Sequence, residues 1–149
     1  MKKCAYLVLL VFTLLVSCSL EDDPNNDFYL EFMPVEDIIM PEEFVHGETY
    51  SIGVSYIKPN SCYQFNNFAY DIDGHERTIA VVNTVYTGSS ANCVGEPVLN
   101  TVSFDFTVTG TDTYIFKFFQ GEDETGTDQY YIIEIPVVDG RSAPAGSKN

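Results

Sequence analysis

VSFDFTV, residues 102–108, alternates apolar and polar side chains along its whole length, with Val102, Phe104, Phe106 and Val108 on one parity. Alternation with period two places every second side chain on one face of a β-strand, so this segment is predicted to be a strand with one buried face. Residues 50–56 (YSIGVSY) follow the same pattern. From residue 28 onward, no segment shows the i, i+3, i+4, i+7 apolar recurrence of an amphipathic helix. This part of the chain is therefore predicted to be all-β.

Turn-forming residues separate the alternating segments at a spacing of roughly eight to twelve residues. They are Pro41 to Glu43 with Gly47, Pro59 with Asn60, Asp73 with Gly74, Gly88, Gly110, and the segment 121–126. About seven short strands separated by turns are typical of an immunoglobulin-like β-sandwich. We expect one such domain over residues 28–139, followed by a disordered tail, residues 140–149. Segments 113–120 and 129–138 are apolar on both faces, which suits the centre of a sheet or a face that meets a partner.

Residues 110–116 (GTDTYIF) resemble the tyrosine corner of immunoglobulin-like domains. In that motif the hydroxyl of a Tyr that opens a strand binds nearby backbone, and a core position follows two residues later. The resemblance implies that Tyr114 binds backbone and that Phe116 is buried. The alternative is that Tyr114 is one more core aromatic residue. The chain has no Trp, and Phe116 stands where antibody domains have Cys, so the resemblance is to the broad class.

The segment 63–72 changes parity part-way along. Tyr63 and Phe65 share one parity, whereas Phe68, Tyr70 and Ile72 share the other. One extra residue in a strand resets the alternation, so a β-bulge at Asn66-Asn67 is predicted to bring all five side chains to one face.

The N-terminus has the three parts of a bacterial export signal: Lys2 and Lys3, an apolar stretch over residues 5–16, and the sequence LVSC, residues 15–18. LVSC resembles the lipobox of bacterial lipoproteins. The resemblance implies cleavage of residues 1–17 and attachment of a diacylglyceryl group and palmitate to Cys18. Residues 18–27 are polar and acidic and are expected to be a flexible, lipidated tether.

The whole chain resembles a small lipoprotein of the Bacteroidota with one immunoglobulin-like domain. Ser19 and the acidic residues 21–23 are similar to sorting signals of outer-membrane lipoproteins. The resemblance implies a lipid anchor in the outer membrane, with the periplasmic and the surface-facing leaflet both open.

The composition is strongly acidic. The 149 residues contain 7 Lys and Arg against 22 Asp and Glu, a net charge of −15. Loss of Lys2 and Lys3 with the signal leaves 5 basic against 22 acidic residues, a net charge of −17. A protein with this charge repels phosphate backbones and anionic headgroups, so we expect no nucleic-acid partner.

Cys62 and Cys93 are the cysteines that remain in the folded domain, because Cys4 leaves with the signal and Cys18 takes the lipid. Two thiols in an oxidising compartment predict one disulfide bond. A hairpin turn at Asp73-Gly74 would place Cys62 opposite residue 86, within reach of the loop that carries Cys93. Free thiols and a metal site are the alternatives. Zinc sites use ligands in closely spaced pairs, and the two cysteines form no such pair with each other or with His46 or His75.

No pattern in the chain predicts catalysis or a cofactor. His46 and His75 lie in turn-like contexts, and no Gly-x-Ser-x-Gly sequence is present. The segment 71–76 (DIDGHE) resembles part of an EF-hand loop, but both end carboxylates of that loop are absent. The acidic run 121–128 is expected to be a solvated hairpin loop. Calcium is its alternative ligand, held by Glu122, Asp123, Glu124 and Asp128.

Three side chains are candidates for a partner surface: Phe119, Tyr130 and Ile132. Their parity places them opposite the predicted core face, so we expect them to lie exposed on the sheet. Exposed aromatic residues on a sheet suit stacking against sugars or contact with a protein, and cross-strand pairing is the alternative. The sequence thus predicts a non-enzymatic binding or scaffolding module at the cell envelope. The second hypothesis is an acidic inhibitor of a secreted basic enzyme such as a lysozyme.

Overall fold

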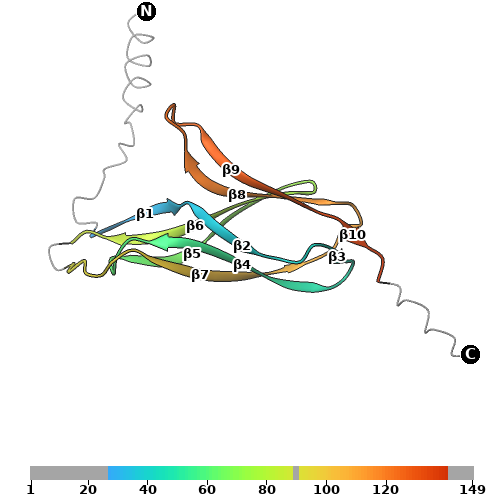
Figure 1. Cartoon of the computed structure of the whole chain (residues 1–149), viewed down its shortest axis with the longest axis horizontal. Helices are drawn as coiled ribbons and strands as arrows, with labels where there is room; N and C mark the ends of the chain where they lie inside the picture. Colours follow the sequence, from blue (N-terminus) through green and yellow to red (C-terminus); the bar gives the residue numbers. More distant parts are fainter. Residues whose placement is uncertain (1–26, 89–90, 141–149) are drawn as a thin grey trace, which may run out of the picture.

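A computed structural model of the chain describes residues 27–88 and 91–140. Within these residues it contains ten β-strands (Figure 1). They are β1 (Phe28–Met33), β2 (Val35–Ile39), β3 (Phe44–Val45), β4 (Thr49–Lys58), β5 (Tyr63–Asp73), β6 (Glu76–Tyr86), β7 (Val98–Thr107), β8 (Tyr114–Glu122), β9 (Asp128–Ile135) and β10 (Val137–Val138). The predicted all-β, immunoglobulin-like sandwich is confirmed.

Two prolines account for strands beyond the expected seven. Pro34 separates β1 from β2, and Pro136 separates β9 from β10. Proline has no N–H to donate to a ladder, so a strand that reaches it ends or changes partner. The predicted strand 129–138 is accordingly divided, and its last two residues pair in parallel with β3 instead.

Two sheets enclose the core. One sheet has the order β1-β6-β8-β9, with β5 on the other edge of β6, and the second has the order β2-β4-β7. Three alternate residues in the middle of β4 are fully buried between them: Ile52, Val54 and Tyr56. Phe106 and Val108 are also buried, which confirms the inward parity of both quoted segments. Val102 and Phe104 have the same parity but are only partly buried, because β7 is an edge strand.

The tyrosine corner is confirmed. The Gly110 N–H donates a hydrogen bond to the Tyr114 hydroxyl at 2.8 Å, and Tyr114 is almost fully buried. Phe116, two residues later, is completely buried and packs against Phe44 and Phe106. The contact fixes the loop before β8 onto the core, and with it the direction in which β8 begins.

The bulge in β5 is also confirmed. Phe65 pairs with Asn83 and Asn67 with Val82, so Asn66 is the extra residue. Its side-chain amide donates to the Thr84 hydroxyl at 2.8 Å. Because of the bulge, the five apolar residues of β5 pair with residues 85, 83, 81, 79 and 77 of β6, which share one face. The rings of Phe65 and Phe68, on either side of the bulge, lie 5.2 Å apart.

Several predictions concern residues outside the described part of the chain. They are the signal peptide 1–17, Cys18, all of the tether except Asp27, and the tail beyond Gly140. Within the described residues, no helix has the length and apolar character needed to cross a membrane.

Candidate binding site

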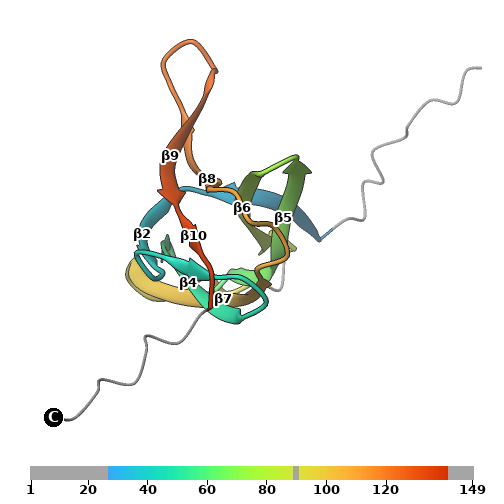
Figure 2. The ribbon, with the colours of Figure 1, turned by 90° about the vertical axis from the view of Figure 1, so that its right-hand side faces the viewer.

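Strand β8 leaves the sheet part-way along its length. Residues 76–79 of β6 pair in parallel with residues 115–118 of β8, and from Val81 onward the same edge of β6 pairs with β1. Phe119 therefore has no partner on β6, and β8 continues paired with β9 alone. Figures 1 and 2 show the resulting hairpin standing away from the body of the molecule. We call residues 119–131 the arm.

The tip of the arm is organised by one carboxylate. Asp123 Oδ1 accepts hydrogen bonds from the Thr125 amide at 2.8 Å, the Thr125 hydroxyl at 2.6 Å and the Thr127 amide at 3.0 Å. These bonds, that of the Thr125 hydroxyl first, lower the pKa of Asp123 below its usual value. Asp123 thus closes the turn.

The calcium hypothesis gains no support from this arrangement. In the part of the chain that the structure describes, no three or more Asp, Glu, His or Cys side chains are grouped as metal ligands. Glu122, Asp123, Glu124 and Asp128 surround a turn that Asp123 already stabilises by hydrogen bonds to the backbone.

A cavity of about 380 Å³ lies between the arm and the outer face of the first sheet. We call it the arm pocket. It is lined by Phe32 from β1, Ala69, Tyr70 and Asp71 from β5, Thr78 and Ala80 from β6, and Phe119, Glu122, Asp128 and Tyr130 from the arm. Its volume is within the range of sites that bind small molecules or protein side chains.

Small side chains form the part of the pocket on the sheet. Ala69 on β5 pairs directly with Ala80 on β6, and Asp71 pairs with Thr78. Their parity is opposite to that of the buried Ile79 and Val81, so these residues face away from the core. The hollow exists because two facing positions carry only methyl groups, while the arm rises beside them.

Aromatic side chains form the wall. The Phe119 ring lies 5.9 Å from that of Phe32 at an interplanar angle of 64°, and 6.2 Å from that of Tyr130 at 69°. Phe119 and Tyr130 pair across the arm, as Lys117 and Ile132 do on the same face. The predicted face is therefore the one that carries the pocket.

The expected exposure of these residues is only partly observed. Ile132 is 56% exposed, as expected. Phe119 was expected to be exposed, but it is only 8% exposed because Phe32 and Tyr130 pack against it. Phe32, which the sequence analysis did not single out, is 54% exposed and presents the accessible ring instead.

Three acidic residues line the pocket: Asp71, Glu122 and Asp128. The Tyr130 hydroxyl donates a hydrogen bond to Asp128 Oδ2 at 3.1 Å. Burial, and next the hydrogen bond to the Asp128 carboxylate, raise the pKa of Tyr130. The side chains of Asp71 and Glu122 make no hydrogen bond or ion pair within the described residues. The nearby Lys117 ammonium is bonded to Glu76.

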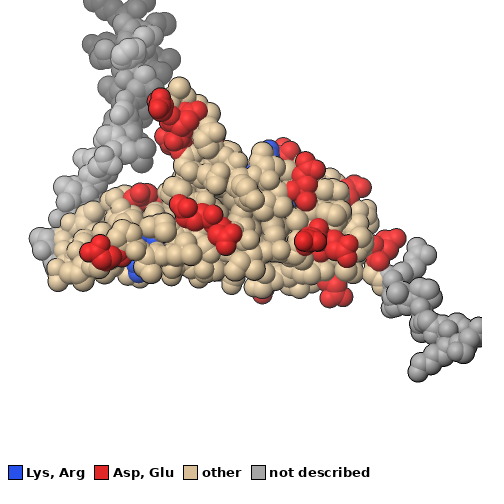
Figure 3. Space-filling view, in the orientation of Figure 1, with Lys and Arg blue, Asp and Glu red and all other residues tan. Residues whose placement is uncertain are grey.

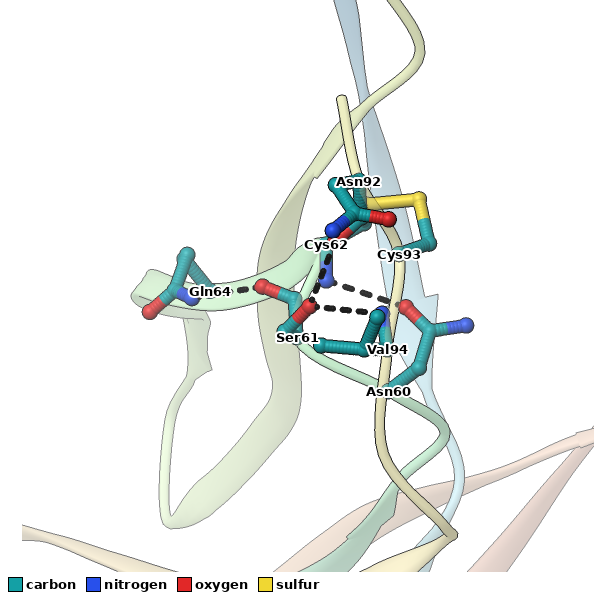
Figure 4. Close-up of a disulfide and its surroundings, with 7 residues drawn as sticks. All are labelled: Asn60, Ser61, Cys62, Gln64, Asn92, Cys93 and Val94. Carbon is teal, nitrogen blue, oxygen red and sulfur yellow. Dashed lines mark hydrogen bonds between the residues drawn. A yellow bond between two sulfur atoms is a disulfide. The ribbon is translucent and has the colours of Figure 1, made fainter. Parts of the chain in front are cut away.

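The cysteine prediction is confirmed. Cys62 and Cys93 form a disulfide bond with a Cα–Cα distance of 5.1 Å, so neither free thiols nor a metal site applies to them (Figure 4). The Tyr86 N–H donates to the Cys62 carbonyl, which places Cys62 opposite residue 86 as predicted. Around the bond, Ser61 and Val94 exchange two hydrogen bonds. The disulfide fixes the loop that carries Cys93 to the start of β5. It lies outside the arm pocket.

His46 and His75 lie in turns outside the arm. His75 Nε2 is 3.2 Å from Asp112 Oδ2, and His46 Nε2 is 3.3 Å from the Thr109 carbonyl oxygen. Neither histidine lines the arm pocket.

A second groove, of about 560 Å³, opens between the edge strands β5 and β7. Phe68, Tyr70 and Phe104 line it; Phe68 and Phe104 pack against the core, and the Tyr70 ring contacts that of Phe104. Its cation, Arg77, already donates to the Gly74 and Glu76 carbonyls and lies 5.0 Å from the Tyr114 ring centre. This groove is therefore a continuation of the core between two sheet edges, with its charged group engaged.

No protein-family model matches the chain, and no curated protein or solved structure shows significant similarity to it. Sequence patterns indicated the arm residues but missed the contributions of Phe32, Ala69 and Ala80. Ala69 and Ala80 are small residues among larger ones in β5 and β6, which was the signal available in the sequence. That they face each other could be known only from the register of the two strands.

Proposed function

We propose that this protein is a lipid-anchored binding module of the cell envelope that receives a protein or glycan partner in the arm pocket. The observation that carries the proposal is the pocket itself. It is an open hollow lined by aromatic and acidic residues, on the side of the sheet that faces away from the core. Pockets that combine an apolar wall with a few polar groups are typical of binding sites.

The scaffold suits such a role because the pocket is held from several directions. Phe116 and Phe118 anchor the base of β8 in the core, and Phe32 on β1 packs against Phe119. The tip is closed by Asp123. The walls are thus positioned before a partner arrives, which lowers the entropy lost on binding.

Filling the hollow tests the role of the pocket. Ala69→Phe places a ring in the cavity without altering a core residue, since Ala69 faces outward. Ser103→Phe on the exposed face of β7 is the matched control. We expect partners recovered from detergent-solubilised envelopes, or on a glycan array, to be lost with Ala69→Phe and retained with Ser103→Phe. Retention with both variants would contradict the proposal.

The anchor has its own test, because Cys18 carries the proposed localisation. Cells that produce the protein are given labelled palmitate. We expect label in the wild-type protein and none in Cys18→Ala, which should also leave the membrane fraction. Equal labelling of both proteins would remove the anchor from the proposal and leave the pocket unaffected.

The charge of the molecule supports a second candidate, inhibition of a secreted basic enzyme. Figure 3 shows acidic side chains over the visible face and at the tip of the arm, with few basic ones. A net charge of −15 accelerates association with a cationic enzyme. The test is an activity assay of lysozyme with and without the protein. Inhibition at low salt that weakens steeply at physiological salt would support this candidate, and full activity at low salt would exclude lysozyme as the target.

A further inference from the structure

We propose that the arm pocket binds a cationic side chain, lysine or arginine, presented by a basic partner protein. This inference rests on the proposed function and names the chemistry of its partner.

The acidic residues of the pocket support a cation. Asp71, Glu122 and Asp128 line the cavity and come from β5 and from both strands of the arm. The side chains of Asp71 and Glu122 have no hydrogen bond or ion pair within the described residues. An ammonium or guanidinium group entering the cavity supplies the missing positive charge.

The protein's own cations do not fill this role. Lys117 lies on the same face as Phe119, but its ammonium is bonded to Glu76. Arg77 faces the core, where its guanidinium donates to two carbonyls and contacts the Tyr114 ring. The pocket lining itself contains no Lys, Arg or His.

The arrangement of the rings favours a cation over a sugar. A sugar stacks on one flat ring face. The rings of Phe32 and Tyr130 both meet that of Phe119 at steep angles of 64° and 69°, so the wall is a corner and not a platform. Ring faces that surround a cavity from different directions attract a cation through their quadrupoles.

The surface beside the pocket favours a protein as the carrier of that cation. On the outer face of β1, the side chains of Phe28, Leu30 and Phe32 are all exposed. The Phe28 ring lies 6.3 Å from that of Tyr86. On β9, next to the arm, Ile132 is exposed on the same face. A small cation would leave this apolar strip uncovered, whereas a protein that inserts one side chain covers it.

The test is a titration of the isotope-labelled protein, followed by amide chemical shifts. The probes are pentalysine with blocked ends, its fully Nε-acetylated form, and the neutral sugar chitotetraose. The variants are Asp71→Asn with Glu122→Gln, and Glu42→Gln with Glu43→Gln as a control that removes the same charge from the exposed turn before β3. We expect saturable shifts of residues 69, 78, 80 and 119 with pentalysine, and none with its acetylated form.

The variants separate local recognition from general attraction. We expect the pocket pair to weaken pentalysine binding about tenfold and the control pair less than about twofold, because close charges act more strongly than distant, screened ones. Equal weakening by both pairs, or shifts spread over the whole acidic surface, would overturn the inference. Pocket shifts with chitotetraose alone would also overturn it, while supporting the proposed function. If no probe shifts the pocket residues, the cation inference fails, and the capture experiment with Ala69→Phe still decides the proposed function.

Discussion

Tyr114 illustrates what a single residue contributes to this fold. Its ring is buried among Phe44, Phe106 and Phe116, while its hydroxyl accepts a hydrogen bond from the Gly110 N–H. A Cβ added at Gly110 would lie 2.9 Å from that hydroxyl oxygen. The corner therefore needs both a hydroxyl at 114 and a hydrogen atom in place of a side chain at 110.

We expect Tyr114→Phe to lower the free energy of unfolding by about 1 kcal/mol, the usual net value of one hydrogen bond. Gly110→Ala is expected to cost about 1–2 kcal/mol, because its methyl group presses on a ring that the core holds in place. The double variant should cost less than the sum, since loss of the hydroxyl removes the clash. Urea unfolding of the four proteins measures this, and strict additivity would contradict the account.

Sequence reasoning succeeded for single residues where the constraint is local. The tyrosine corner is confined to residues 110–116, and the cysteine pair depended on one hairpin turn. It failed for the exposure of Phe119. Parity fixes the face on which a side chain lies, but the burial of Phe119 depends on Phe32, which is distant in the sequence.

At the scale of elements, the bulge in β5 is the feature that the chain specifies most directly. The parity change between Phe65 and Phe68 requires an extra residue, and the structure places it at Asn66. The partner of β8 could not be predicted in the same way. Whether β8 stays on β6 depends on β1 taking the remaining edge, which is a competition between strands far apart in the chain.

Deletion of Asn66 should turn Phe68, Tyr70 and Ile72 to the outer face. We expect the free energy of unfolding to fall by about 1–2 kcal/mol more than in Asn66→Ala, since Phe68, which packs against the core, becomes exposed. Asn66→Ala keeps the bulge and loses only the bond to Thr84. Chemical denaturation compares the two. A deletion no more harmful than Asn66→Ala would mean that the bulge does not set the register.

The disulfide bond joins the start of β5 to the loop before β7, across a sequence separation of 31. The chain-entropy relation for a loop of this size gives roughly 3–4 kcal/mol of stability. The double variant Cys62→Ala with Cys93→Ala is expected to lose that amount in urea unfolding. A loss below about 1 kcal/mol would show that the loop is held by the hydrogen bonds of Ser61 and Val94.

At the scale of the whole molecule, the arm pocket requires elements that no single segment encodes. Two small residues face each other on β5 and β6, and one aromatic residue comes from β1. The arm contributes two further aromatic residues and two acidic residues. The all-β sandwich was predictable because alternation and turns recur along the chain. The pocket was not, because it depends on register and on where β8 departs from the sheet.

Contact between the partner and the arm pocket can be tested directly in the cell. A photo-crosslinking benzophenone residue is placed at Tyr130 or, as the control, at Ser103, and the cells that produce the protein are irradiated. We expect a discrete crosslinked species from position 130, lost when Ala69→Phe is added, and none from position 103. The same species from both positions, or one from 130 that persists with Ala69→Phe, would contradict the account.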